Sequence, residues 1–325
     1  MYRIGIVGIG GMGTVHFNNY KHINIAKVVS VCDSDQSRGE LFASENRVTC
    51  YKTIDEMLKN EELDVIDVCT PTFTHRENVL KAIDAKKHVI CEKPLDLTLA
   101  GAKQMIEAAE KAGVMLFVGQ VLQYARETEV LRDLVNTNIY GKVLDAQFLR
   151  LSACPKWIKN GWLFEKEKSG LLPFDLHIHD LDLIISLFGV PKDFSFTCCG
   201  NEGKDYKEHY RFTYRYEDKS ISAEAAWYNA SFPFTAAWRV YFENAVVVND
   251  GNKVTAYEVD CEPKIFDIEE KIKIPTGINL PPTGIFLAEL SDFLSLIKPG
   301  KSGCTRKNEI LATIGLLEKI QDSTL

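Results

Sequence analysis

Lys93 lies in the segment CEKPL, immediately after an apolar run that predicts a buried strand. A positive charge at the carboxyl end of such a strand can stabilise a developing alkoxide or orient a carbonyl oxygen, as hydride transfer to or from a nicotinamide requires. Pro94 restricts the backbone directly after the lysine, and the bond before it can be cis. We therefore expect Lys93 to act in catalysis; the alternative is an ordinary solvated surface lysine.

A second group of chemically active side chains lies in the stretch SGLLPFDLHIHDLDLIISLFG, at residues 169–189. Asp175 and His179 are four residues apart, so on a helix they share one face. The carboxylate can then orient the imidazole and stabilise its protonated form, which makes His179 a candidate general base for an alcohol proton. His177 lies about 200° away around the same helix and points elsewhere.

Two other interpretations of this stretch stay open. Histidines that are hydrogen-bonded within a structural helix give the same pattern, and H-x-H-D-x-D also resembles a cluster of metal ligands. A metal site needs further ligands at suitable spacing, and the remaining histidines provide no such pattern. They are His16, His22, His75, His88 and His209. We favour catalysis and predict no metal.

The element expected to hold the ligand is a glycine-rich turn near the start of the chain, in the sequence GIVGIGGMG. Gly8 allows a tight turn after a strand, Gly10 lets the backbone approach a pyrophosphate, and Gly13 lets the following helix pack on the strand. We expect the helix to begin near Met12, just after Gly11, with its free N–H groups pointing at the phosphates. The turn therefore predicts dinucleotide binding; the alternative is an ordinary connection between a strand and a helix.

An acidic residue after the second apolar run indicates which dinucleotide binds. Asp33 follows Val28–Cys32 and lies twenty residues after Gly13, the separation found in dinucleotide-binding folds. A carboxylate here accepts hydrogen bonds from the adenine-ribose hydroxyls and repels a 2′-phosphate. This favours NAD, but Arg38 is close enough in sequence to supply a compensating cation, so NADP stays open.

Composition limits the class of protein. A chain of 325 residues that is 46% hydrophobic can bury a large core in about two domains. A net charge of −7 without a dense Lys/Arg block argues against nucleic acid as the main partner. No apolar run is long enough for a membrane span, and a first strand at residue 2 leaves no room for a signal peptide, so we expect a cytoplasmic protein. The nine cysteines are odd in number and contain no C-x-x-C, which predicts reduced thiols.

The order of apolar and amphipathic segments predicts the fold. Short apolar runs alternate with helical patterns up to residue 121, as in βαβ units around a parallel sheet. The expected strands are 3–7, 28–32, 64–69, 88–91 and 114–118. The expected helices, over the whole chain, are 77–86, 98–112, 128–136, 175–188, 286–297 and 308–320. Successive strands with turn signals over 193–274 predict an antiparallel sheet.

We therefore expect an α/β protein with two domains: a Rossmann dinucleotide-binding domain at residues 1–121 and an α+β domain at 122–325. In open α/β sheets, ligands bind outside the carboxyl ends of the strands. Thr70–His75 and Glu92–Pro94 leave such ends, so they should border the same crevice as the glycine turn.

Together, GIGGMG, Asp33, TPTFTH, CEKPL and D-x-H-x-H-D-x-D resemble the family of glucose-fructose oxidoreductase and inositol dehydrogenase over essentially the whole chain. The resemblance implies a second domain with a large, open, mainly antiparallel sheet that commonly forms the oligomer interface, hence a homodimer or homotetramer. It implies a sugar, cyclitol or related polyol as substrate. By the same resemblance, Lys93, Asp175 and His179 match the catalytic residues, and the cofactor-side positions are matched by Thr70, Pro71, His75 and Glu92.

The chain also departs from the family pattern. His177 stands where relatives often have glycine, and Gln120 and Gln123 stand where many relatives carry an arginine. These residues would border the pocket, so they bear on which substrate fits it. Aromatic faces suit the C–H surfaces of sugars, with core packing as the alternative for either tryptophan. The substrate-side candidates are Gln120, Tyr124, Trp157, Trp162 and His177.

The sequence thus predicts an NAD(P)-dependent dehydrogenase or reductase of sugar-like substrates. One alternative is an NAD-dependent glycosidase of the same broad family, which oxidises its substrate transiently and returns the hydride. Another is a non-catalytic dinucleotide sensor. A sensor needs no proton acceptor beside the nicotinamide, so the set of Lys93, Asp175 and His179 argues against it.

Overall fold

A computed structural model describes residues 1–156, 159–278 and 280–324. The chain forms two compact units. Unit 1 comprises Met1–Tyr124 and Glu270–Lys307, and unit 2 comprises Ala125–Glu269 and Asn308–Leu325. The sequence predicted a single domain boundary, after residue 121. In the structure the first boundary lies three residues later. Residues 270–307 then return to unit 1, so the second domain is not the continuous segment that we expected.

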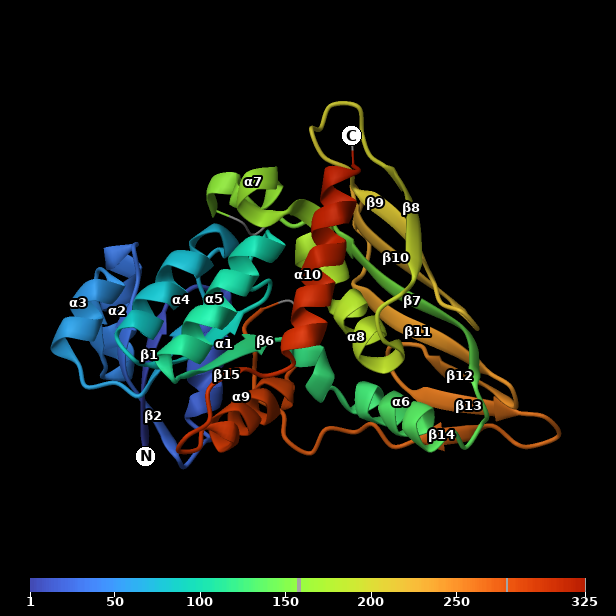
Figure 1. Ribbon diagram of the computed structural model, residues 1–325, viewed down its shortest axis with the longest axis horizontal. Helices are drawn as coiled ribbons and strands as arrows, with labels where there is room; N and C mark the ends of the chain where they lie inside the picture. The colour runs from blue at the N-terminus through green and yellow to red at the C-terminus, as the bar shows by residue number, and fades with distance from the viewer. Residues whose placement is uncertain (157–158, 279, 325) are drawn as a thin grey trace. The chain divides into compact units, whose positions relative to one another are not determined.

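Unit 1 is built on a seven-stranded parallel sheet with the order β15-β6-β5-β4-β1-β2-β3 (Figure 1). Its strands are β1 (Tyr2–Val7), β2 (Ala26–Cys32), β3 (Thr49–Tyr51), β4 (Val65–Val68), β5 (His88–Glu92), β6 (Met115–Gly119) and β15 (Gly303–Cys304). The five expected strands are confirmed to within two residues at each end. The other two, β3 and β15, were not predicted.

Helices cover this sheet. They are α1 (Gly11–Tyr20), α2 (Gln36–Asn46), α3 (Ile54–Asn60), α4 (His75–Asp84), α5 (Leu99–Ala112) and α9 (Ile285–Leu296), with short 3₁₀ turns η1 (Thr72–Thr74) and η2 (Val121–Tyr124). Neighbouring helices α3, α4 and α5 pack together, and α1 packs against α9. Because helices bury the sheet, strand β4 is buried along its whole length, as is typical of parallel sheets.

Helix α9 explains why the chain returns to unit 1. Its buried residues join the core formed by β1, β2, β6 and α1, and the Phe293 ring stacks on Phe117 of β6 with centroids 4.9 Å apart. Strand β15 then extends the sheet by pairing with β6 in parallel. The apolar period predicted a helix at 286–297, but such a period does not say which surface the helix will cover.

Unit 2 contains an eight-stranded sheet with the order β14-β13-β12-β11-β7-β10-β9-β8. All its neighbouring strands are antiparallel except β7 and β10, which are parallel, so the predicted mainly antiparallel sheet is confirmed. The strands are β7 (Val143–Ala153), β8 (Asp193–Cys199), β9 (His209–Arg215), β10 (Ser220–Tyr228), β11 (Thr235–Phe242), β12 (Ala245–Asn249), β13 (Val254–Glu258) and β14 (Lys264–Phe266).

One face of this sheet is covered by helices, with α8 and α10 running along it (Figure 1). The helices of unit 2 are α6 (Arg126–Thr137), α7 (Lys166–Ser169), α8 (Ile178–Phe188) and α10 (Lys307–Asp322), preceded or joined by the 3₁₀ helix η3 (Lys159–Phe164) and the π-helical turn η4 (Pro173–His177). Along β9, Tyr210, Phe212 and Tyr214 are buried and alternate with more exposed residues, which leaves the opposite face of the sheet open.

None of the helices in the described parts of the chain has the length and apolarity needed to cross a membrane.

Candidate active site

The glycine turn connects β1 to α1, and its three glycines meet different surroundings. Gly8 has a φ of +91°, and a Cβ there would lie 2.8 Å from the Cys69 carbonyl oxygen. A Cβ on Gly13 would lie 1.9 Å from the Gly8 carbonyl oxygen. A Cβ on Gly10 would meet nothing within 4 Å. The fold itself therefore requires glycine at positions 8 and 13, whereas Gly10 leaves open space where a bound phosphate can approach the backbone.

Asp33 follows β2 and holds the glycine turn in place. Its carboxylate is only 3% exposed, and Oδ2 accepts a hydrogen bond from the Ile9 N–H at 2.9 Å. The Arg38 guanidinium donates to both carboxylate oxygens and is itself 41% exposed. The hydrogen bond to Asp33 raises the pKa of Arg38. Asp33 thus connects the turn, the end of β2 and a cation at the position expected to contact the adenine ribose.

His75 connects the loops that follow β4 and β5. Its Nδ1 lies 2.8 Å from the Pro94 carbonyl oxygen and its Nε2 lies 2.8 Å from the Thr70 carbonyl oxygen. Burial lowers the pKa of His75, while these two carbonyl groups raise it. The side chain is 1% exposed, and both ring nitrogens have protein partners. We expected His75 beside the cofactor; in the structure its ring lies between two loops at the edge of the sheet where we expect the cofactor.

The EKP segment leaves β5 as the sequence predicted. Lys93 is half-buried, and its peptide bond to Pro94 is cis. The Lys93 backbone N–H donates to Glu92 Oε2 at 3.0 Å. The Glu92 carboxylate points into the protein, where Oε1 lies 3.1 Å from His16 Nε2. Glu92 is therefore held by protein groups on both oxygens, and Lys93 is the more exposed member of the pair. Thr70 and Pro71, after β4, lie between buried and exposed.

Beneath these loops lies a group of buried polar side chains that the sequence analysis did not connect. His16 Nδ1 lies 2.9 Å from Asp67 Oδ2, which also accepts a hydrogen bond from the Tyr20 hydroxyl at 2.9 Å. The Cys69 thiol lies 3.4 Å from both His16 Nδ1 and Asp67 Oδ1. Burial lowers the pKa of His16, but Asp67 and Cys69 together more than offset this and leave the pKa well above its ordinary value.

This buried group comes from three separate elements. His16 lies on α1, Asp67 on β4 and Glu92 on β5, and the strand order β5-β4-β1 brings them together. The nitrogen, carboxylate oxygen and sulfur of His16, Asp67 and Cys69 lie within 4.8 Å of one another, a set that could ligate a metal ion. The hydrogen bonds among them already satisfy the same atoms.

In unit 2, Asp175 and His179 lie at the start of the helical region that the sequence predicted. The expected uninterrupted α-helix at 175–188 is corrected: residues 173–177 form a π-helical turn and α8 begins at Ile178. Such turns are frequent at functional sites. Within Leu171–Ile185, Asp175 and His179 are the residues that are not buried. The two proposed catalytic side chains therefore reach the surface of an otherwise buried segment.

His177 lies in the core of unit 2, which corrects its expected place beside the substrate. Its side chain is fully buried, stacks on Phe212 with ring centroids 3.8 Å apart, and places Nε2 2.6 Å from the Tyr214 hydroxyl. Burial, together with the positive charge of Arg150, lowers the pKa of His177 to about 3. Asp180 is also buried and accepts two hydrogen bonds from Arg150, at 2.8 and 2.9 Å.

The remaining substrate-side candidates have different surroundings. Gln120 is buried at the end of β6, with 4% of its surface exposed. The Tyr124 hydroxyl donates to Asp292 of α9 at 2.7 Å, and the ring packs edge-on against Phe293, so Tyr124 anchors η2 within unit 1. Trp162 is partly buried in η3. Trp157 lies outside the described residues.

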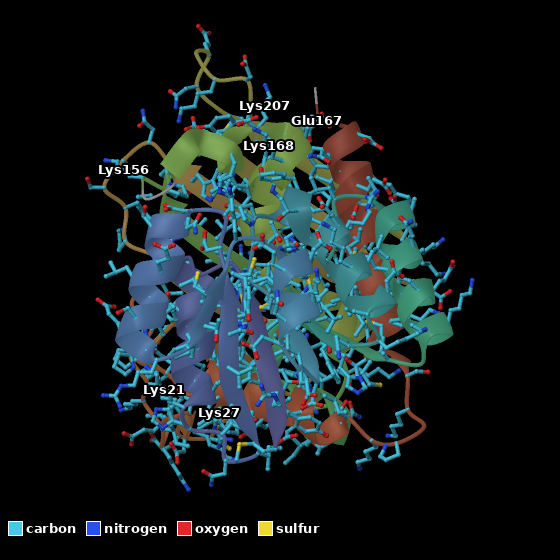
Figure 2. The ribbon with its side chains drawn as sticks, turned by 90° about the vertical axis from the view of Figure 1, so that its left-hand side faces the viewer. Lys21, Lys27, Lys156, Glu167, Lys168 and Lys207 are labelled. Atoms are coloured by element: carbon cyan, nitrogen blue, oxygen red, sulfur yellow. The ribbon has the colours of Figure 1, made fainter. Side chains whose placement is uncertain are left out.

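Two other surface regions bear on the location of the site. Lys21 follows α1 and Lys27 lies near the start of β2, and Figure 2 shows both at the same end of unit 1. They mark the amino-terminal edge of the parallel sheet, opposite the edge with the glycine turn and Lys93.

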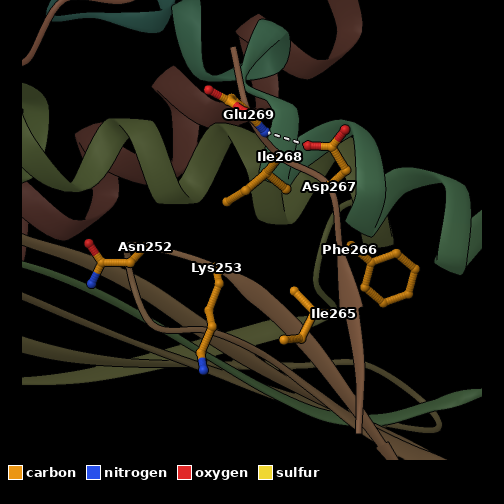
Figure 3. Close-up of a pocket in the computed structure, with 7 residues that line it drawn as sticks. All are labelled: Asn252, Lys253, Ile265, Phe266, Asp267, Ile268 and Glu269. Carbon is orange, nitrogen blue, oxygen red and sulfur yellow. Dashed lines mark hydrogen bonds between the residues drawn. The ribbon is translucent and has the colours of Figure 1, made fainter.

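A hollow in unit 2 is lined by residues 252–253 and 265–269 (Figure 3). Its polar groups are engaged locally, as in the 2.9 Å hydrogen bond from the Glu269 N–H to Asp267, and it contains none of the candidate residues.

Comparison with known proteins relates the first part of the chain to one family. A model of an oxidoreductase family with an NAD-binding Rossmann fold, GFO_IDH_MocA, matches residues 2–120. Residues 2–120 therefore resemble the NAD-binding domain of the GFO_IDH_MocA family. The match spans β1 to β6 and includes the glycine turn, Asp33 and Lys93.

Proteins of similar sequence have several named activities. The chain is 32% identical to myo-inositol 2-dehydrogenase of Thermotoga maritima over 188 residues, which cover 58% of this chain and 55% of that protein. It is 32% identical to 2,7-anhydro-N-acetylneuraminate hydratase of Escherichia coli over 191 residues, which cover 58% of this chain and 50% of that protein. The matches thus span about half the length of these relatives.

A structural relative extends the likeness in fold to both units. The structure of levoglucosan dehydrogenase in complex with NADH and levoglucosan superposes with a TM-score of 0.83 and 17% sequence identity. The alignment covers 98% of this chain and 95% of that chain.

Proposed function

We propose that the chain is an NAD(P)-dependent oxidoreductase that transfers hydride between nicotinamide and a secondary hydroxyl or carbonyl carbon of a sugar, cyclitol or related polyol. The main support is the carboxyl-terminal edge of the unit 1 sheet. There the open space at Gly10, the Asp33 carboxylate and the half-buried Lys93 follow β1, β2 and β5 respectively. Ligands of doubly wound sheets bind at this edge.

Three residues of the chain would have separate roles in hydride transfer. A bound nicotinamide supplies the acceptor or donor of hydride. Lys93 would place its ammonium group beside the reacting oxygen and stabilise charge that develops there. His179 would take the hydroxyl proton when an alcohol is oxidised, and Asp175 would orient the imidazole. The partial exposure of Asp175 and His179 within an otherwise buried segment supports their roles.

NAD is the cofactor that we propose first. Asp33 is buried at the end of β2 and can accept hydrogen bonds from ribose hydroxyls, whereas a 2′-phosphate at this position would face a carboxylate. Arg38 already pairs with both oxygens of Asp33, so NADP binding would need this guanidinium to turn toward the phosphate.

The substrate class rests on the named relatives. Myo-inositol 2-dehydrogenase and levoglucosan dehydrogenase are named for oxidation of a cyclitol and an anhydrosugar. One relative is named a hydratase, and addition of water changes no net oxidation state. This observation favours, as a second candidate, a reaction in which hydride leaves the substrate and returns to it. The glycosidase alternative belongs to the same redox-neutral class.

We further propose that the open face of the unit 2 sheet pairs with a second copy of the chain. Tyr241, Val246 and Tyr257 lie side by side across β11, β12 and β13. The two tyrosines are 46% and 48% exposed, so an apolar row crosses the uncovered face. A Tyr241→Lys exchange should lower the mass measured by light scattering if this face forms the oligomer.

A substrate panel tests the proposed function. Polyols, cyclitols, aldoses and anhydrosugars should be incubated with the protein and NAD or NADP, while reduction is followed at the nicotinamide absorbance. We expect turnover with at least one secondary alcohol. Analysis of the products separates the two candidates: net formation of reduced nicotinamide supports the dehydrogenase, and a changed substrate without net reduction supports the redox-neutral reaction. Neither product with any substrate would count against both.

A further inference from the structure

Glu92 connects the loop that carries Lys93 to the interior of unit 1. One carboxylate oxygen, Oε2, accepts the Lys93 backbone N–H at 3.0 Å, and the other, Oε1, lies 3.1 Å from His16 Nε2. Glu92 is 7% exposed, so little water reaches it. A carboxylate that is removed from water depends on such hydrogen bonds to keep its position.

The imidazole of His16 is fixed from its other side. Its Nδ1 lies 2.9 Å from Asp67, and neither side chain has any exposed surface. Asp67 is held in turn by the Tyr20 hydroxyl at 2.9 Å. Because Asp67 orients the ring, the second ring nitrogen of His16 points at Glu92. The orientation of Glu92 is therefore set from within the core, beginning at β4.

The backbone of the neighbouring strand β6 approaches the Glu92 carboxylate closely. A Cβ on Gly119 of β6 would lie 3.2 Å from Glu92 Oε1, so the carboxylate would have to shift slightly to make room for it. Glycine at this position thus keeps the space that the Glu92 carboxylate fills. The carboxylate is confined between His16 and the Gly119 backbone, with Lys93 on its remaining oxygen.

Two proton arrangements agree with these contacts. Either His16 is an imidazolium between two carboxylates, or its Nε2 accepts a hydrogen bond from the O–H of a neutral Glu92 while its Nδ1–H donates to Asp67. In both, one hydrogen bond joins His16 to Glu92, and His16, Asp67 and Glu92 together hold a net charge of −1. The mechanical link between His16 and Glu92 is the same in either form.

We propose that His16 is a positioning residue: its imidazole, oriented by Asp67, fixes the Glu92 carboxylate, which in turn anchors the backbone N–H of Lys93. The proposal rests on the proposed function, in which the Lys93 ammonium acts on the reacting oxygen. A small displacement of a catalytic group slows the chemical step more than it weakens cofactor binding.

Two substitutions of equal charge separate this role from simple core packing. The amide nitrogen of His16→Asn can replace Nδ1, which faces Asp67, and that of His16→Gln can reach the position of Nε2, which faces Glu92. Each variant keeps one half of the histidine's contacts. Hydrogen–deuterium exchange of the Lys93 amide, measured on the full chain, reports the anchor directly and does not depend on a substrate.

We expect His16→Asn to speed exchange of the Lys93 amide by at least about tenfold relative to His16→Gln. With a substrate from the panel, kcat of His16→Asn should be about 10- to 100-fold below that of His16→Gln, with KM for the dinucleotide similar in both. Equal amide exchange in the two variants would overturn the proposal. A difference in exchange without turnover of any substrate supports positioning by His16 and overturns the proposed function instead.

A second measurement retains the native histidine, in case His16→Asn does not fold. In protein labelled with ¹⁵N-histidine, Glu92→Ala should shift the His16 Nε2 resonance. Tyr20→Phe removes a contact to Asp67 only and serves as the control, because it should leave the Nε2 resonance close to its native position. An unshifted Nε2 resonance in Glu92→Ala would overturn the link between His16 and Glu92.

Discussion

The guanidinium group of Arg38 donates two hydrogen bonds to the carboxylate of Asp33, from Nη2 to Oδ1 at 2.7 Å and from Nε to Oδ2 at 3.1 Å. A bidentate pair of this kind occupies the oxygens that would accept the ribose hydroxyls of NAD. Asp33 is buried and held by the Ile9 N–H, whereas Arg38 is 41% exposed. The guanidinium is therefore the partner that can move when a dinucleotide binds.

Removal of Arg38 should increase the preference for NAD. In Arg38→Ala the Asp33 carboxylate is left without its cation, so a 2′-phosphate meets uncompensated negative charge while ribose hydroxyls gain free acceptors. We expect kcat/KM with NADP to fall at least about tenfold, and kcat/KM with NAD to stay equal or rise. Arg76→Ala is the matched control, since Arg76 forms a similar pair with Asp96 at 2.6 and 2.8 Å. An unchanged ratio in Arg38→Ala would contradict the prediction.

Two glycine substitutions should separate cofactor binding from folding. Gly10→Ala adds a methyl group where nothing in the protein lies within 4 Å, so the melting temperature should be nearly unchanged. The methyl group would stand in the way of the pyrophosphate, and NADH affinity measured by fluorescence should fall at least about tenfold. Gly13→Ala places Cβ 1.9 Å from the Gly8 carbonyl oxygen and should lower the melting temperature instead. If Gly10→Ala bound NADH normally, the turn would not be the phosphate site.

The parallel sheet and the location of the glycine turn could be predicted because both follow from local pattern. Strands that are buried on two faces, such as β4, are short continuous apolar runs, and parallel order follows from the intervening helices. The end of β1 then fixes where Gly8 must lie, and the end of β2 fixes Asp33. Strands β3 and β15 have three and two residues, which is too short to show a period.

The group around His16 could not be predicted, because its members meet only through the strand order. His16 is separated by 51 residues from Asp67 and by 76 from Glu92, and no spacing in the sequence connects them. The helix at 285–296 presents the same difficulty. Its apolar face was visible in the sequence, but the contact of Phe293 with Phe117 depends on tertiary structure.

The location of His177 could not be predicted from the sequence for a different reason. The α-helical spacing placed His177 on a different side of the helix from Asp175 and His179. It did not predict which side of the helix would face the core. The ring can serve as an aromatic core residue, stacked on Phe212 and hydrogen-bonded to Tyr214, as readily as a polar group in a pocket. Only the positions of β9 and α8 decide between these roles.

Burial of His177 should make unit 2 sensitive to mild acid. Its folded-state pKa of about 3 lies below the ordinary value of 6.5, so the unfolded chain binds a proton first as the pH falls. The stability associated with the neutral ring is present above pH 6.5 and is lost progressively toward pH 3, at about 1.4 kcal/mol per pH unit.

His177→Gln should reduce this sensitivity, because glutamine can accept the Tyr214 hydroxyl hydrogen bond but does not titrate. Between pH 7 and pH 5, the loss in free energy of unfolding should be about 2 kcal/mol smaller in the variant than in the unchanged protein. Urea unfolding followed by tryptophan fluorescence measures this locally, since all four tryptophans lie between residues 125 and 269, in unit 2. Parallel pH dependence in the two proteins would show that His177 is not the responsible group.

Lys93→Ala and His179→Ala should each lower kcat by at least about 100-fold on any substrate that the panel identifies. Lys93→Ala removes the charge beside the reacting oxygen, and His179→Ala removes the proton acceptor. NADH affinity should change little in either variant, because neither side chain forms part of the glycine turn or of the Asp33 site. Lys103→Ala and His22→Ala remove exposed residues of the same types and should leave kcat unchanged. Full turnover in both test variants would contradict the roles proposed for Lys93 and His179. A loss of NADH affinity equal to the loss of kcat would indicate that the substitutions act on cofactor binding instead of on chemistry.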